Sequence, residues 1–218
     1  MSIELFVFPP SPRAFKVMAV ANHLGLDTKI RLVNLVKGEQ KNPDYAALNP
    51  NMRMPTLRDG DYVLWEANAI LQYLAGKKPE SGLLPKDERG RLNVTRWQFW
   101  DLAHWDQACA VFAFEYVAKP LLLKINEPDL AAIAKATDLF HRAAKVLDGE
   151  LQGRKFVTGD ALTVADFSLG AALNLAQPAH YPIDPYGNIK RWFAGLSALP
   201  AWQKTLAQCA LPAATAAA

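Results

Sequence analysis

Ser11 is a residue whose side chain could do chemistry, and three prolines surround it in the segment FPPSPRAFKV at residues 8–17. A serine followed by proline, just before a run without helix breakers, is typical of an N-cap residue with proline at the first helical position. A hydroxyl at that place could instead act on a bound group. The dipeptide alone favours the capping interpretation and leaves the chemical one open.

A second segment, Arg53-Met54-Pro55-Thr56, could bind a peptide through its backbone. If the Met54–Pro55 bond is cis, the N–H and C=O groups of Met54 face outward, where they can pair with another peptide as a strand would. A trans proline at the start of a strand explains the same residues without a ligand. Because cis is the minority state of X–Pro bonds, this segment alone favours trans.

A third segment, Trp65-Glu66-Ala67-Asn68-Ala69-Ile70, begins a helical pattern with a carboxylate. The free N–H groups of a helix start favour an anion, and a carboxylate beside them favours an ammonium group. Together they suit a zwitterion such as the head group of an amino acid. Glu66 could equally do no more than complement the helix dipole, and the residues leave these alternatives balanced.

The elements that would position these segments lie in residues 1–77. Short apolar, strand-like segments occur at 3–8, 29–33, 56–58 and 62–65, and helical patterns at 14–24, 43–48 and 67–75. An Asp59-Gly60 pair between the last two strand-like segments is typical of a hairpin turn. The order β-α-β-α-β-β-α predicts one sheet covered by helices.

The rest of the chain has a helical pattern. Residues 78–88 contain prolines and glycine and form a predicted linker, which leaves residues 89–218 as an all-helical domain. Helices are expected near 88–116, 129–147, 163–176, 189–196 and 202–207. The fold class predicted from this layout is a small α/β domain followed by an all-α domain.

Composition excludes several classes of function. The formal net charge of this 218-residue chain is +3 and its charges are interleaved, so no nucleic-acid-binding patch is expected. No apolar stretch reaches the length of a membrane span and no signal peptide is visible. Cys109 and Cys209 form no CxxC pair, so a reducing, cytoplasmic setting is expected and a disulfide framework is not. No cluster of His, Cys and Asp predicts a metal site.

In order and spacing, these segments resemble the soluble glutathione transferases, of the serine-type theta, delta and phi kinds and their bacterial relatives. The resemblance covers the whole chain and implies a thioredoxin-like first domain. In residues 1–77 it rests on Pro9-Pro10-Ser11 and on residues 38–41, 49–50, 54–56 and 64–70. In the second domain, residues 156–160 before 162–166 resemble the helix-capping signature of the family.

The resemblance implies a role for each matching residue. Ser11 would donate a hydrogen bond to the sulfur of glutathione, which reacts as a thiolate; such a donor near a helix start lowers the thiol pKa. The other matches are Gln40 and Lys41 at the glycyl carboxylate, Met54 with Pro55 at the cysteinyl backbone, and Arg53, Glu66, Ala67 and Asn68 at the γ-glutamyl end.

One position departs from the family pattern. The family usually has Ser or Thr where this chain has Ala67, and that hydroxyl helps to bind the γ-glutamyl carboxylate. Loss of one hydrogen bond to a charged group costs roughly 1.5–3 kcal/mol. We therefore expect weaker glutathione binding, or repair by the amide of Asn68.

The sequence gives weaker signals for the site of the second substrate, the electrophile. The resemblance implies an apolar pocket at Pro10 and along the long helix of the second domain, where Trp105, Ala108, Phe112 and Tyr116 recur at helical spacing. The same stripe is expected of plain core, and core is the favoured interpretation for most of it.

The function expected from the resemblance is conjugation of glutathione to a hydrophobic electrophile, a detoxification reaction, by a homodimer without metal. Trp97, Phe99 and Trp100 on the long helix are expected to be exposed, which is compatible with a dimer. Two alternatives stay open. One is a specialised glutathione-dependent dehalogenase or ether-cleaving enzyme; the other is a non-enzymatic binding protein, which the departure at Ala67 keeps under consideration.

Overall fold

A computed structural model describes residues 2–210 of the chain. The chain divides into two compact units, one made of Met1–Ser81 with Ser197–Ala218 and the other of Gly82–Leu196. The helical domain predicted for residues 89–218 therefore differs from this division at its C-terminal end. The last eight residues of that predicted domain lie outside the described residues.

The first unit is built on a four-stranded sheet in the order β2-β1-β3-β4. The strands are β1 (Ile3–Val7), β2 (Thr28–Leu32), β3 (Thr56–Asp59) and β4 (Tyr62–Trp65). Strand β1 is parallel to β2 and antiparallel to β3, and β3 and β4 form the predicted hairpin. Gly60 supplies the positive φ of 66° that its turn requires.

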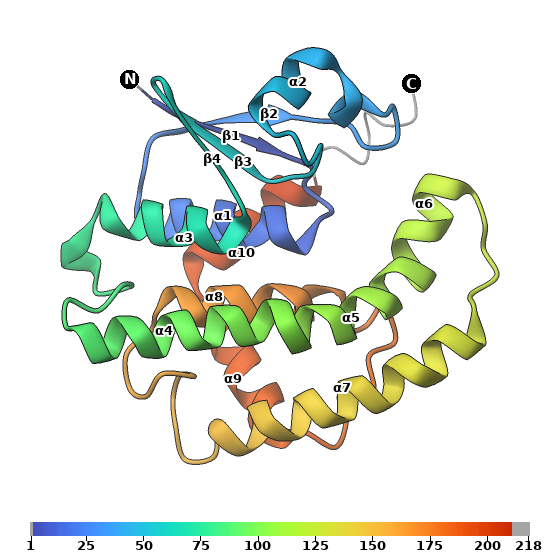
Figure 1. The fold of residues 1–218 in the computed structure, drawn as a ribbon. Helices are drawn as coiled ribbons and strands as arrows, with labels where there is room; N and C mark the ends of the chain where they lie inside the picture. The colour runs from blue at the N-terminus through green and yellow to red at the C-terminus, as the bar shows by residue number, and fades with distance from the viewer. Residues whose placement is uncertain (1, 211–218) are drawn as a thin grey trace. The chain divides into compact units, whose positions relative to one another are not determined.

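Helices cover this sheet. They are α1 (Pro12–His23), η1 (Glu39–Lys41, a 3₁₀ turn), α2 (Pro43–Leu48), α3 (Ala67–Gly76), η2 (Pro79–Ser81, a second 3₁₀ turn) and α10 (Pro200–Ala210). Helices α1 and α3 pack side by side on one face of the sheet, and α2 lies toward the other face (Figure 1). The predicted order β-α-β-α-β-β-α is confirmed.

Helix α1 is buried all round, from Ala14 to Ala21. The cause is α10, which packs against α1 although about 180 residues separate them in sequence. The rings of Phe15 and Trp202 lie 4.9 Å apart, and the amide of Asn22 donates to Thr205 Oγ1 at 2.8 Å. For this reason the end of the chain belongs to the first unit.

The second unit is all helical, as predicted. A continuous helical run comprises α4 (Glu88–Trp100), η3 (Asp101–Trp105), α5 (Asp106–Ala113), η4 (Phe114–Ala118) and α6 (Lys119–Leu123). Beyond it are α7 (Leu130–Glu150), α8 (Val164–Gly170), the 3₁₀ segment η5 (Ala171–Leu175) and α9 (Gly187–Ser197). Helix α7 packs along α5, and α8 packs on α4 (Figure 1). The predicted single helix at 88–116 is longer and contains two π-helical segments, η3 and η4.

The predicted capping motif of the second unit is present. The Thr163 hydroxyl and the Asp166 carboxylate form a reciprocal capping box at the start of α8. Asp166 is fully buried, and its oxygens also accept hydrogen bonds from the Val157 N–H at 2.9 Å and from the indole N–H of Trp192 at 3.0 Å. One carboxylate thus joins the start of α8, the preceding loop and α9.

One expectation for the long helix is wrong. Trp97 was expected to be exposed together with Phe99, but it is only 3% exposed, whereas Phe99 is 68% exposed. The reason is the helical period: Trp97 lies one turn after buried Val94 and one turn before buried Asp101, on the inner face of α4.

Candidate functional site

The register of the sheet brings the predicted site segments to one end of the first unit. Phe6 pairs with Thr56, and Thr56 pairs with Trp65. The segments that follow β1, precede β3 and follow β4 therefore all meet at this end. Parallel strand β2 ends there too, since Val7 pairs with Leu32. Ligands of α/β sheets commonly bind at such an end, outside the carboxyl ends of parallel strands.

Ser11 begins α1 at this end. Its backbone is extended, its N–H donates to the Phe8 carbonyl at 2.9 Å, and its own carbonyl accepts from the Phe15 N–H at 2.9 Å. Its side chain makes no capping hydrogen bond to the first turn. The capping interpretation, which the sequence favoured, thus holds for the Ser11 backbone only. The hydroxyl stands at the positive end of a twelve-residue helix with Pro12 at its first position.

The segment before β3 is held by α2. The Tyr45 hydroxyl donates to the Arg53 carbonyl at 2.6 Å, and the Asn49 amide donates to the same oxygen at 2.8 Å. Burial raises the pKa of the Tyr45 hydroxyl and keeps it a donor. The Met54–Pro55 bond is cis, the alternative that the sequence had not favoured. The Arg53 side chain is exposed, and that of Met54 is buried.

Glu66 is the N-cap of α3 and has φ 73° and ψ 112°. A positive φ is strained for a residue with a Cβ atom, and such residues cluster at functional sites. The side chain is exposed, while Ala67 and Asn68 behind it are buried. Nothing in the residue types around Glu66 signals this conformation, so sequence reasoning missed it.

Asn68 does not stand alone at the start of α3. Its Oδ1 accepts a hydrogen bond from the ammonium group of Lys16 at 2.9 Å, and both side chains are buried. Sequence reasoning also missed Lys16. The available signal was a lysine inside the otherwise apolar run of α1, because lysine is rarely found on a buried helix face.

Gln40 and Lys41 lie in the 3₁₀ turn η1, between β2 and α2. Gly38, with φ 73°, begins this turn. The Oε1 atom of Gln40 is buried and has no hydrogen-bond partner within residues 2–210, which is uncommon for a buried polar atom. Lys41 is exposed.

The residues predicted for the electrophile site fall into two groups. Trp105, Ala108 and Phe112 are at most 2% exposed and lie in the interior of the second unit. The Trp105 indole donates to the Leu169 carbonyl at 3.0 Å. Tyr116 is half-buried, in the π-helical segment η4. Burial favours the core interpretation for the first three residues.

Pro10, the remaining member of that set, is exposed just before Ser11 in the first unit. The cysteines do not resemble nucleophiles. Burial raises the pKa of the Cys109 thiol well above its ordinary value and that of Cys209 to about 11, which disfavours the reactive thiolate.

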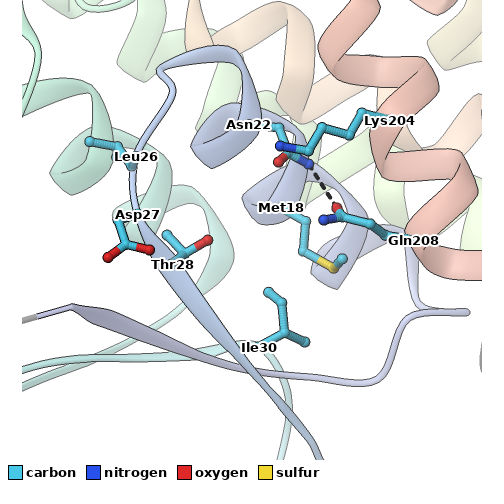
Figure 2. A pocket seen from close by; sticks show the side chains of 8 residues that line it. All are labelled: Met18, Asn22, Leu26, Asp27, Thr28, Ile30, Lys204 and Gln208. Atoms are coloured by element: carbon cyan, nitrogen blue, oxygen red, sulfur yellow. Dashed lines mark hydrogen bonds between the residues drawn. The ribbon is translucent and has the colours of Figure 1, made fainter.

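A separate hollow of about 190 Å³ lies elsewhere in the first unit (Figure 2). It is lined by residues from the C-terminal half of α1, from β2 and its preceding loop, and from α10: Met18, Asn22, Leu26, Asp27, Thr28, Ile30, Lys204 and Gln208. The Asn22 amide crosses it to donate to Gln208 Oε1 at 2.8 Å. None of the predicted glutathione-binding residues lines this hollow.

Within residues 2–210, no three or more His, Cys, Asp or Glu side chains are grouped so that they could hold a metal ion. Among the same residues, every helix is too short or too polar to cross a membrane.

Comparison with known proteins identifies the family. The profile of the glutathione S-transferase N-terminal domain matches residues 1–76, and that of the glutathione S-transferase C-terminal domain matches residues 131–195. Glutathione S-transferase 3 of Zea mays is 34% identical over 216 residues, which is 96% of each chain.

Solved structures agree in fold. The apo form of glutathione S-transferase III has a TM-score of 0.85 and 32% identity, covering 97% of this chain and 99% of that one. Glutathione S-transferase-I bound with lactoylglutathione has a TM-score of 0.84 and 26% identity, covering 95% and 99%. The predicted fold, a thioredoxin-like domain followed by a helical domain, is confirmed. The chain belongs to the glutathione S-transferase family.

Proposed function

We propose that this protein is a serine-type glutathione transferase that conjugates glutathione to a hydrophobic electrophile. The observation that carries the proposal is the position of Ser11: its hydroxyl makes no cap, stands at the start of α1, and lies at the sheet end where the other site segments meet. The maize relative bears the name of this activity, and one similar structure holds a glutathione derivative.

Glutathione would lie extended across this end of the sheet. The backbone of Met54 would pair with the cysteinyl residue in the manner of an added strand. The N-terminal turn of α3 would receive the γ-glutamyl carboxylate on its free N–H groups, and the exposed carboxylate of Glu66 would meet the ammonium group. The glycyl carboxylate would face Lys41, with Gln40 beside it.

The proposed chemistry begins with loss of the thiol proton of glutathione to solvent or to a group of glutathione itself. The Ser11 hydroxyl donates a hydrogen bond to the resulting sulfur anion, and the start of α1 adds its positive potential. The sulfur lone pair then forms a bond to the electrophilic carbon, and the leaving group departs with its electron pair. The protein contributes thiolate stabilisation and proximity.

The electrophile site remains a proposal based on Pro10 and Tyr116, which have exposed surface. Trp105, Ala108 and Phe112 would contribute only through a rearrangement of the core of the second unit, because they are buried. A specialised dehalogenase or ether-cleaving activity uses the same sulfur chemistry with another leaving group. A panel of electrophiles would separate these reactions.

We also propose a homodimer in the cytoplasm. On α4, Leu92 and Phe99 are 60% and 68% exposed and lie seven residues apart, on one face of the helix. Such an exposed apolar face suits a second copy of the chain. The cytoplasmic setting rests on the cysteine usage. The cytoplasmic setting and the placement among bacterial relatives are predictions from the sequence.

Conjugation of glutathione to an aryl halide tests the proposal, with Ser11→Ala as the variant and Ser2→Ala, at the opposite end of β1, as its control. Loss of one donor to a developing or stabilised anion lowers kcat/KM by about 100-fold or more. Equal rates for Ser11→Ala and wild type would refute the role of Ser11. If the wild-type protein binds no glutathione, the result would instead favour the alternative that this chain is a non-enzymatic binding protein.

A further inference from the structure

The buried lysine of α1 has no role in the site as described so far. Lys16 is 3% exposed, and its ammonium donates to Asn68 Oδ1 at 2.9 Å. Lysine is almost never fully buried unless its ammonium group is paired, because removal of that group from water is costly. The buried ammonium of Lys16 brings a positive charge next to the start of α3.

The place of this hydrogen bond is specific. Lys16 lies in the second turn of α1, five residues after Ser11, and helical side chains lean toward the N-terminus of their helix. Asn68 is the second residue of α3, directly after Glu66 and Ala67. The bond therefore joins the second turn of α1 to the first turn of α3, and both helices begin at the proposed glutathione site.

Covalent geometry limits how far the charge is from a bound carboxylate. Within one asparagine, Oδ1 lies at most about 5 Å from the backbone nitrogen. With the 2.9 Å hydrogen bond, the Lys16 ammonium is then within about 8 Å of the Asn68 N–H, and a carboxylate on that N–H is within about 11 Å. At that separation and an effective dielectric constant near 20, a unit charge changes a dissociation constant on the order of tenfold.

Because residue 67 is alanine, a nearby positive charge would strengthen the binding of a carboxylate at the start of α3. A side chain with a hydroxyl at this position could donate to a carboxylate at the start of α3, and alanine cannot. A carboxylate there would receive only backbone N–H groups, at a helix start whose N-cap, Glu66, is itself an anion.

We propose that Lys16 is a positioning residue of the glutathione site. Its buried ammonium holds the first turn of α3 through Asn68 and supplies the positive potential that binds the α-carboxylate of the γ-glutamyl residue. The proposal rests on the function proposed above and names the part of the substrate on which Lys16 acts.

The test uses two peptides and measures their binding to the full chain by calorimetry. One is glutathione, and the other is 4-aminobutanoyl-cysteinylglycine, which lacks only the γ-glutamyl α-carboxylate. Lys16→Met should weaken glutathione about tenfold and the second peptide less than about twofold. Lys16→Arg should restore the wild-type preference. Lys29→Met, which removes an exposed lysine of β2, is the control and should change neither affinity.

A second variant removes the charge of Lys16 but keeps a hydrogen-bond donor for Asn68 Oδ1. Lys16→Gln should produce the same selective loss, so the proposal can be tested even if Lys16→Met does not fold. If both peptides lose affinity equally, Lys16 has only a structural role. If neither peptide loses affinity, the charge of Lys16 does not contribute to binding. Either outcome overturns the proposal. Wild type that binds neither peptide would overturn the proposed function itself.

Discussion

The backbone of Glu66 offers a prediction that separates an effect on stability from an effect on glutathione binding. Its φ of 73° and ψ of 112° lie outside the regions that residues with a Cβ atom normally occupy. Glycine adopts positive φ freely, whereas alanine keeps the Cβ atom and its strain. Comparison of Glu66→Gly with Glu66→Ala therefore isolates the strain, because both variants lose the same carboxylate.

The magnitude follows from two opposing effects. Strain at such a residue costs about 1–3 kcal/mol, which glycine relieves. Glycine also gains entropy in the unfolded chain, which costs about 0.5–1 kcal/mol relative to alanine. We expect Glu66→Gly to be about 1 kcal/mol more stable to unfolding than Glu66→Ala, which corresponds to roughly 2–4 °C in Tm for a chain of this size.

Thermal unfolding of both variants, followed by circular dichroism, gives the difference in Tm directly. Glutathione binding should weaken in both variants to a similar extent, because each lacks the carboxylate proposed to meet the γ-glutamyl ammonium group. If Glu66→Gly unfolds at a lower temperature than Glu66→Ala, the residue behaves like any unstrained position, and the strain argument is refuted.

Other predictions test the second unit. Asp166→Ala leaves buried donors, including the Trp192 indole, without an acceptor, so urea denaturation should show a loss of about 3–5 kcal/mol; a loss below about 1 kcal/mol would contradict the network. The Lys119 ammonium lowers the pKa of Glu115, so its stabilisation is complete above the ordinary carboxyl pKa of about 4.3 and is lost as the pH falls through the lowered value. Glu115→Gln should therefore have a lower Tm than the wild-type protein at about pH 7, and this difference in Tm should become smaller below about pH 4. A difference in Tm that does not depend on pH would argue against this linkage. Phe99→Glu should convert a dimer into monomers in light scattering, and an unchanged mass would exclude this face of α4 from the interface.

The elements of the first unit were predictable because their signals are local. Alternation of apolar residues marks the strands, Asp59-Gly60 marks the hairpin turn, and Ser11-Pro12 marks the start of α1. In the structure, the strands and the start of α1 lie within two residues of their predicted boundaries. Local patterns carry this information because neighbouring residues alone determine period, turn and cap.

Other features depend on residues that are far apart in sequence. The packing of α10 on α1 and the Lys16–Asn68 hydrogen bond join positions about 180 and 52 residues apart, and no period in the sequence encodes such pairs. The stripe at Trp105 and Phe112 was ambiguous for a related reason. Helical spacing shows which residues share a face, and only the position of α7 shows that this face is closed.

The central claim is that Ser11 activates the thiol of glutathione, and the pKa of the bound thiol tests it most directly. The ultraviolet absorbance of the thiolate would be followed against pH with saturating glutathione, in wild type and in Ser11→Ala. The wild-type protein is expected to lower the pKa of the bound thiol from about 8.5 to about 7 or below, and Ser11→Ala is expected to return this pKa toward the free value. A lowered pKa that is the same in both proteins would contradict the account, because the thiolate would then be stabilised without the Ser11 hydroxyl.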